Sequence, residues 1–191
     1  MRMTYYRMLT GKKCYLSPCL PEDAERWAEW FNDLEVAIPL GDEAYTPASL
    51  EGEQEAIREI QEDNSHVFSI VDLKTDRAIG RCMFFNVDAI NRTAMLGIVI
   101  GEKSRWGQGY GQEAVRLLLD YGFNLLNLNS VMLGTYSFNE RAIRCYEKVG
   151  FQRIGRRREA RIIAGEKHDL ILMDILADQF ESPYIKPMLA R

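Results

Sequence analysis

Three strand-like segments follow one another between residues 66 and 101, and they constrain the fold more than any other feature. They span His66–Leu73, Ala78–Val87 and Thr93–Gly101, and each is rich in β-branched or aromatic residues. The turns between them hold only four and five residues, whereas a parallel pair of strands needs a connection of about a dozen. The three segments are therefore predicted to pair as an antiparallel meander.

Segments with helical or strand periodicity lie on both sides of this meander. Before it, we expect a strand at Lys12–Pro18, a helix that opens at Pro21, a loop at Asn32–Thr46 and an acidic helix from Pro47 to about Asp63. After it, we expect a helix ending near Leu126, a strand at Val131–Tyr136, a helix at Asn139–Val149 and two long strands, Phe151–Ile163 and His168–Ala177. The order β-αα-βββ-α-β-α-ββ predicts an α+β fold in one domain, residues 1–191, with a mixed, mostly antiparallel sheet and helices on both faces.

Composition argues against several classes of protein. Of the 191 residues 47% are apolar and 27% are charged, which is typical of a globular chain. The net charge of −4 argues against nucleic-acid binding, and no apolar run approaches the roughly 18 residues of a membrane span. Two histidines and four cysteines without C-x-x-C spacing argue against a metal site. Scattered cysteines and a basic N-terminus without an apolar core favour a cytoplasmic protein.

The mild net charge conceals two opposed segments. Residues 33–63 hold ten acidic residues and one basic residue, a local charge of −9. Residues 140–167 hold nine basic and four acidic residues, a local charge of +5. Two solvated faces would explain this split, and so would a preference for a cationic partner on one side and an anionic partner on the other.

A glycine-rich turn, Arg105–Gly111 (RWGQGYG), lies between the third strand of the meander and a helix. Its backbone N–H groups can converge on anionic oxygens, and the dipole of the following helix adds to the attraction. The residues concerned are Gly107, Gln108, Gly109, Tyr110, Gly111 and Gln112. The spacing is not that of a P-loop, and the turn does not open a strand–helix–strand unit, which disfavours a dinucleotide site. A tight turn without a ligand is the alternative.

Residues 139–151 read N-E-R-A-I-R-C-Y-E-K-V-G-F. Together with the glycine-rich turn, this block resembles the acetyl-CoA-binding helix of the GNAT superfamily of N-acetyltransferases. It is similar to the corresponding segment of aminoglycoside acetyltransferases, and Asp120–Leu128 (DYGFNLLNL) is similar to a helix end in bacterial spermidine acetyltransferases. The resemblance extends from about Tyr15 to Phe180. The family's phosphate turn reads Q/R-x-x-G-x-G/A, and Trp106 stands here at its first position, as it does in the ribosomal-protein and aminoglycoside branches.

This resemblance implies a GNAT-like acyl-CoA N-acyltransferase fold, acetyl-CoA as the co-substrate and no metal. It implies that the pantetheine arm binds the exposed strand backbone at Ile98, Val99 and Ile100, and that the pyrophosphate binds between Trp106 and Gln112. For the strand, burial in the core is an alternative that is compatible with binding, because alternate residues face opposite sides.

The next helix contributes three further residues by the same resemblance. Asn139 would bond the pantetheine arm, although an N-cap role is the alternative, and Arg144 would attract the anionic co-substrate. Tyr146 would donate a proton to the departing CoA thiolate, with helix packing as its alternative. Cys145 lies beside it. A covalent cysteine mechanism is disfavoured, because no histidine lies near Cys145 in the sequence to activate the thiol.

The group that deprotonates the acceptor amine is not assigned by the sequence. Some polyamine-acetylating relatives place a glutamate where this chain has Met95-Leu96-Gly97. The acids that remain are Glu102, Asp33, Glu35, Asp42 and Glu43, with a water chain as a further option.

The resemblance puts the acidic segment over the acceptor site. We therefore expect a cationic primary amine as acceptor, either a polyamine, an aminoglycoside, another small amine or a protein N-terminus, and neither a nucleic acid nor a membrane as partner. The long final strands are compatible with a homodimer formed through the sheet. The alternative function is a non-catalytic acyl-CoA-binding sensor or interaction module on the same fold.

Overall fold

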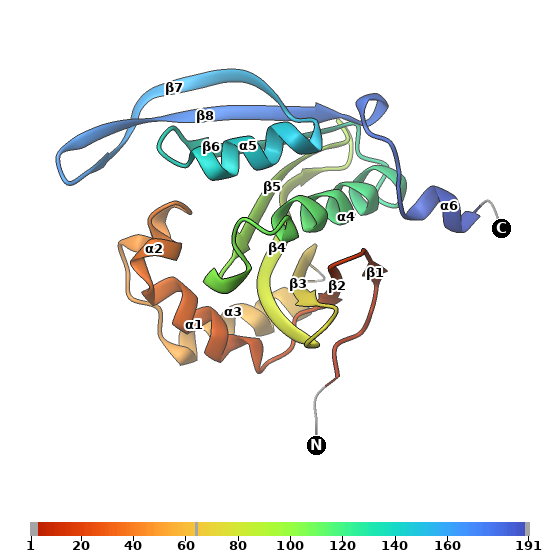
Figure 1. Cartoon of the computed structure of the whole chain (residues 1–191), viewed down its shortest axis with the longest axis horizontal. Helices are drawn as coiled ribbons and strands as arrows, with labels where there is room; N and C mark the ends of the chain where they lie inside the picture. Colours follow the sequence, from red (N-terminus) through yellow and green to blue (C-terminus); the bar gives the residue numbers. More distant parts are fainter. Residues whose placement is uncertain (1–3, 64, 190–191) are drawn as a thin grey trace.

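One mixed sheet organises the protein. Among residues 4–63 and 65–189, which the computed structural model describes, eight strands are ordered β1-β2-β3-β4-β5-β6-β8-β7 (Figure 1). The strands are β1 (Leu9–Thr10), β2 (Cys14–Pro18), β3 (Val67–Asp72), β4 (Arg77–Asp88), β5 (Thr93–Ile100), β6 (Ser130–Tyr136), β7 (Gln152–Ile163) and β8 (Glu166–Leu176). The α-helices are α1 (Asp23–Asn32), α2 (Leu34–Ala37), α3 (Leu50–Glu62), α4 (Tyr110–Asn124), α5 (Glu140–Val149) and α6 (Ile185–Leu189). Short 3-10 helices are η1 (Asp42–Ala44), η2 (Lys103–Arg105) and η3 (Ala177–Gln179).

The sheet splits between β5 and β6. Strands β2, β3, β4 and β5 pair antiparallel with one another in that order, so the predicted meander is confirmed. β5 and β6 run parallel but pair only from Thr93 to Met95 of β5. β6 then pairs with β8 over its whole length, while β5 continues along β4 to Ile100. Within residues 4–63 and 65–189, one edge of β5 is therefore left without a strand partner beyond Met95.

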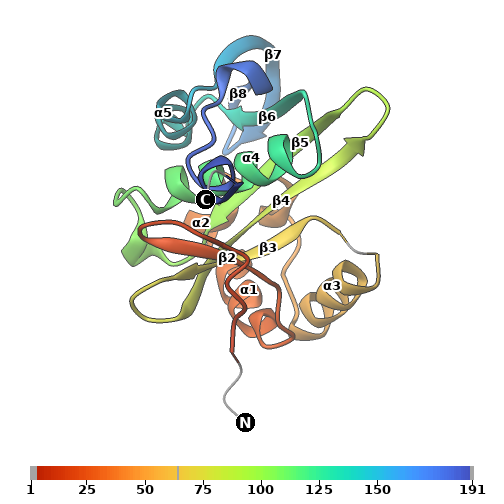
Figure 2. The ribbon, with the colours of Figure 1, turned by 90° about the vertical axis from the view of Figure 1, so that its right-hand side faces the viewer.

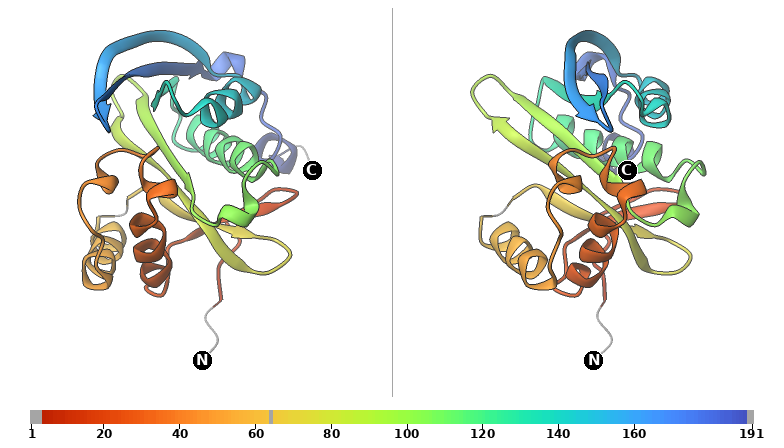
Figure 3. Two further views of the ribbon diagram at one scale, coloured as in Figure 1. Left: turned by 60° about the vertical axis from the view of Figure 1, so that its left-hand side comes forward. Right: turned by 90° about the vertical axis from the view of Figure 1, so that its left-hand side faces the viewer.

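Helices cover both faces of the sheet, as the element order predicted. Figure 2 shows α1 and α3 on one side of β3 and β4, and α4 on the other. Along β4, Cys82 and Phe84 join the core beneath α4, whereas Met83 packs against the cluster that contains Trp27 and Trp30 of α1. This alternation follows from the pleat, because successive strand residues face opposite sides. The long hairpin of β7 and β8 lies at the end of the molecule away from α1 and α3 (Figure 3).

Several elements differ from the prediction. The segment 32–46 is not all loop, because α2 and η1 form within it. The Asp33 side chain caps α2 by accepting from Glu35 N, and Val36 and Ala37 are buried. The second helix begins at Leu50 rather than Pro47, because Ser49 Oγ accepts from Gly52 N and caps it there. The short β1 and α6 were not predicted.

No helix in the described ranges is long and apolar enough to cross a membrane. The four cysteines are free thiols, and Cys14, Cys19 and Cys82 are buried.

Candidate functional site

A cavity of about 800 Å³ opens where β5 and β6 diverge. Its wall on the α4 face includes the glycine-rich turn and α5, and its wall on the α1 face includes residues of α1, α2 and β4. The cavity therefore passes through the sheet at the split and joins the two faces. Of the predicted site residues within the described ranges, it brings together Ile98, Val99, Ile100, Trp106, Gly107, Gly109, Tyr110, Gly111, Gln112, Asn139, Arg144 and Tyr146.

The glycine-rich turn leads directly into the N-terminus of α4. Gly109 is the N-cap of this helix and has φ 86°, a left-handed conformation that a side chain would strain. The helix runs for 15 residues, so the unpaired N–H groups and the positive end of its dipole face the cavity wall at Tyr110–Gln112. Gln108 does not line the cavity, because its side-chain amide donates to Ser104 O at 2.5 Å and braces the turn instead.

Trp106 ties this turn to the neighbouring elements. Its Nε1 donates to Ile100 O at 2.6 Å, and the guanidinium of Arg141 on α5 lies 3.7 Å from the centre of its ring. Trp106 thus connects the turn to β5 and to α5. It occupies the position at which the phosphate turn of the GNAT superfamily, which this chain resembles, usually has glutamine or arginine.

The free edge of β5 presents backbone groups to the cavity. The carbonyl of Arg92, just before β5, accepts from the N–H of Asn129, just before β6. Backbone groups of successive strand residues point to alternate edges, so Ile98 and Ile100 have the same orientation as Arg92. Beyond Met95 no strand pairs with this edge in the part of the chain that the structure describes. The N–H groups of Ile98 and Ile100 are therefore directed at the cavity, whereas the Val99 side chain packs on the α1 face.

Helix α5 forms the opposite wall. Asn139 Oδ1 accepts from Ala142 N at 3.2 Å, so the N-cap role considered for it is present, and the residue also lines the cavity. Arg144 is exposed and pairs with Glu140 at 2.7 Å. The helix ends at Gly150, which has φ 121°.

Tyr146 of α5 also lines the cavity. It is buried, and its ring meets that of Phe151 edge-on at 5.9 Å, so the packing role is also real. Burial raises its pKa, and the neighbouring Cys145 adds to the increase, so the phenol stays protonated at neutral pH. No hydrogen-bond partner for its hydroxyl is found among residues 4–63 and 65–189, which leaves the proton free for a group in the cavity. Burial also raises the pKa of Cys145 to about 11, which makes it a poor nucleophile.

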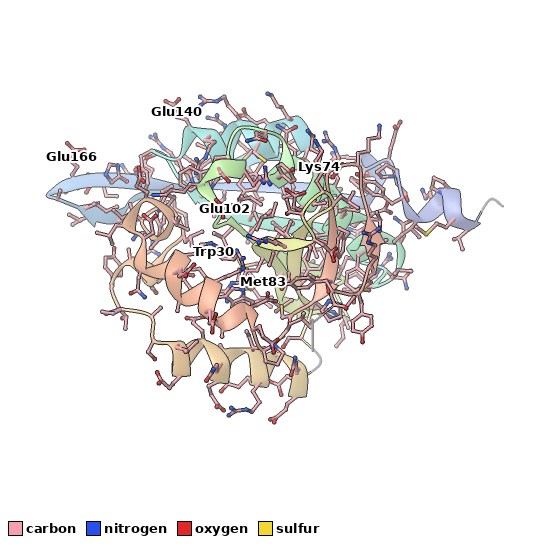
Figure 4. All side chains as sticks on the ribbon, turned by 60° about the horizontal axis from the view of Figure 1, so that its bottom comes forward. Trp30, Lys74, Met83, Glu102, Glu140 and Glu166 are labelled. Carbon is pink, nitrogen blue, oxygen red and sulfur yellow. The ribbon has the colours of Figure 1, made fainter. Side chains whose placement is uncertain are left out.

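Most of the carboxylates considered as bases are engaged elsewhere. Asp33 and Glu35 both pair with Lys103, at 2.6 and 2.5 Å. Glu102 accepts from Ser104 at the start of η2, and Figure 4 shows it above Trp30 and Met83. Among the described residues, Glu43 is the one carboxylate on the cavity wall. The other acids of segment 33–63 do not line the cavity, although the charge of Glu53 on α3 acts on Arg81, which does.

Three basic residues on the cavity wall were not among the site residues predicted from the sequence. Arg105 lines the cavity and pairs with Asp72, which is fully buried, at 2.8 Å; Tyr110 Oη also donates to Asp72 at 3.1 Å. Lys148 lines the α5 wall, and Arg81 lines the wall on the α1 face. Arg105 opens the glycine-rich turn, so its position was the signal. No local sequence pattern identifies Arg81 as a site residue, because it lies on the cavity wall only through the register of β4 on β5.

Comparisons with known proteins agree with this geometry. The family described as Acetyltransferase (GNAT) domain matches residues 13–152. An uncharacterized N-acetyltransferase of Bacillus licheniformis is 30% identical over 94% of this chain and 99% of its own. A probable N-acetyltransferase of Bacillus subtilis is 32% identical over 88% of this chain and 97% of its own. The crystal structure of a Vibrio cholerae spermidine N-acetyltransferase in complex with CoA and spermine has a TM-score of 0.76 and 24% identity, covering 87% of this chain and 96% of that one.

Proposed function

Because this chain belongs to the GNAT acetyltransferase family, we propose that it transfers an acetyl group from acetyl-CoA to a primary amine. The observation that carries the proposal is one cavity that joins the glycine-rich turn at the N-terminus of α4, the free edge of β5 and a tyrosine whose raised pKa keeps it protonated. We further propose that the protein is cytoplasmic, which its four free thiols support, and that it forms a homodimer. The dimer is supported by the edge strand β7, which exposes Ile154 and Ile162.

The backbone donors and cations on the cavity wall suit the polar groups and the negative charge of acetyl-CoA. The N–H groups from Gly109 to Gln112 would hold the pyrophosphate, and the cations Arg105, Arg141, Arg144 and Lys148 would favour its negative charge. The backbone of Ile98 and Ile100 would bond the pantetheine amides along the free edge of β5. The co-substrate supplies an acetyl group that its thioester bond activates.

Three groups of the chain would then act on the transfer. The amine reaches the split in the sheet from the α1 face, where Glu43 would accept its proton directly or through water. The N–H of Ile98 or Ile100 would stabilise the negative charge that develops on the carbonyl oxygen. Tyr146 would hold a proton at Oη for the sulfur that leaves.

The phosphate turn is tested by a matched pair of glycine variants. Gly109 has φ 86° and Gly165, in the turn between β7 and β8, has φ 84°; an added methyl group clashes with no atom at either position. Substitution of alanine at either position should lower the free energy of unfolding by about 1–2 kcal/mol, because the positive φ strains a residue with a side chain. We expect Gly109→Ala to weaken CoA binding about tenfold, because a shift of the turn misaligns the N–H groups at the start of α4.

Isothermal titration with CoA measures this difference. Gly165→Ala should lose similar stability but keep the CoA affinity of the original protein. Equal CoA affinity in the two variants would remove the turn from the binding site.

A further inference from the structure

Arg81 carries a positive charge into the half of the cavity that receives the amine. Its guanidinium lies 4.5 Å from the centre of the Trp27 ring and 4.6 Å from that of Phe31. Its Nε is fully buried and has no hydrogen-bond partner. No carboxylate in the described ranges forms an ion pair with it within 4.0 Å, although the charges of Glu53 and Glu43 favour its cationic form against the effect of burial.

Such a cation is costly to keep in a folded protein. Removal of a guanidinium from water is unfavourable unless the charge is paired and its donors are satisfied. The faces of two aromatic rings compensate only part of this cost, and they leave the N–H groups unused. The planar fork of arginine is suited to binding a carboxylate through two parallel hydrogen bonds. A site that is incomplete without a ligand explains Arg81 better than packing alone.

The register of the sheet places Arg81 close to the reacting groups. On the face that α1 covers, Arg81 stands opposite Val99 of β5, and the next pair on this face is Met83 and Gly97. Opposed residues of antiparallel strands have Cα atoms about 4.5–5.5 Å apart. Val99 lies between Ile98 and Ile100, whose N–H groups face the split. An anion held by Arg81 would thus lie in the same cavity as an amine at the split, on the face that α1 covers.

Glu43 on the same cavity provides the opposite charge. Together the two side chains complement a molecule that has an ammonium group at one point and an acid group at another. A second ammonium group beside Arg81 would be repelled, which disfavours polyamines.

We propose that Arg81 binds a carboxylate of the acceptor, so that the acceptor is an amine with an acid group a few bonds from its amino group. This inference rests on the proposed function. Two sources have this chemistry, a free amino acid and the N-terminus of a peptide with an acidic residue next to it.

Three amines of one chain length provide the test: δ-aminovalerate, pentylamine and cadaverine, which end in a carboxylate, a methyl group and an ammonium group. We expect kcat/KM for release of the CoA thiol to be at least about tenfold higher for δ-aminovalerate than for pentylamine, and lowest for cadaverine. Peptides that begin Ala-Asp or Ala-Asn, assayed beside free aspartate and asparagine, distinguish the two sources.

Variants of β4 assign the preference to Arg81. In Arg81→Met, whose side chain can still pack on Trp27 and Phe31, the ratio of δ-aminovalerate to pentylamine should fall to near one. Arg81→Lys should retain part of it, and Arg77→Met, at an exposed position of the same strand, all of it. Equal use of the three amines, a preference for cadaverine, or an equal loss for all acceptors in Arg81→Met would overturn the inference. No thiol release with any amine would instead mean that the proposed function is wrong.

Discussion

Replacement of Tyr146 by phenylalanine is expected to lower kcat by about 10²- to 10³-fold, the range of a lost general acid. The affinity for CoA should stay within about twofold, because backbone groups provide most of the binding. Phenylalanine keeps the edge-on contact with Phe151 and loses only the hydroxyl, so the fold should be retained. Stopped-flow and steady-state measurements of thiol release give kcat, and titration gives the CoA affinity.

The pH dependence of this variant follows from the direction of the pKa shift. Burial raises the pKa of Tyr146 above the ordinary value of about 10, so its proton is retained throughout an assay from roughly pH 6.5 to 9. The loss in kcat should therefore be constant over that range. The neighbouring variant Cys145→Ala should keep kcat within about threefold, because a thiol with a pKa of about 11 is almost entirely protonated. A Tyr146→Phe enzyme with unchanged kcat would remove this residue from the chemistry.

Replacement of Glu113 by glutamine is expected to lower the free energy of unfolding by about 3 kcal/mol. The Glu113 carboxylate, in the first turn of α4, accepts from the backbone N–H groups of Lys12, Lys13 and Cys14 at 2.8, 2.6 and 2.9 Å. Glutamine presents an NH₂ group to these donors and leaves at least one of them buried without an acceptor. The midpoint of thermal unfolding should fall by roughly 6–12 °C in a chain of this size.

Glu140→Gln serves as the control for this change. Its carboxylate is exposed and pairs with Arg144 on the helix surface, a kind of contact that contributes about 0.5 kcal/mol or less. Calorimetry should show a shift of no more than about 2 °C for Glu140→Gln. Similar midpoints for the two variants would mean that Glu113 does not hold the β1–β2 turn against α4.

The sequence predicted those parts of the site that rest on local patterns. The meander follows from the short turns between its strands. The glycine-rich turn was predicted from its glycines alone, and Gly107 and Gly109 do have the positive φ that glycine favours. Asn139 and Tyr146 were predicted as site residues from the resemblance of residues 139–151 to the family's CoA-binding block, and both line the cavity, one as the N-cap of α5 and the other within it.

The cavity wall on the α1 face was predicted only in part, because Glu43 was one of five candidate bases and Arg81 was not a candidate at all. Arg81 reaches the cavity through the register of β4 on β5, and Glu43 through η1, which lies in a segment predicted as loop. Asp33 and Glu35 were candidate bases until Lys103, far along the chain, was found to bind both. Contacts between segments of such separation are set by the sheet, and no local pattern in the chain encodes them.

Turnover of acetyl-CoA with a panel of primary amines is the most direct test of the central proposal. Each cycle should release one CoA thiol and yield one N-acetylated amine, detected by mass spectrometry, and N,N-dimethylated forms of the same amines should not react. Tight binding of CoA with no product from any amine would contradict the proposal and favour a protein that binds acyl-CoA without catalysis.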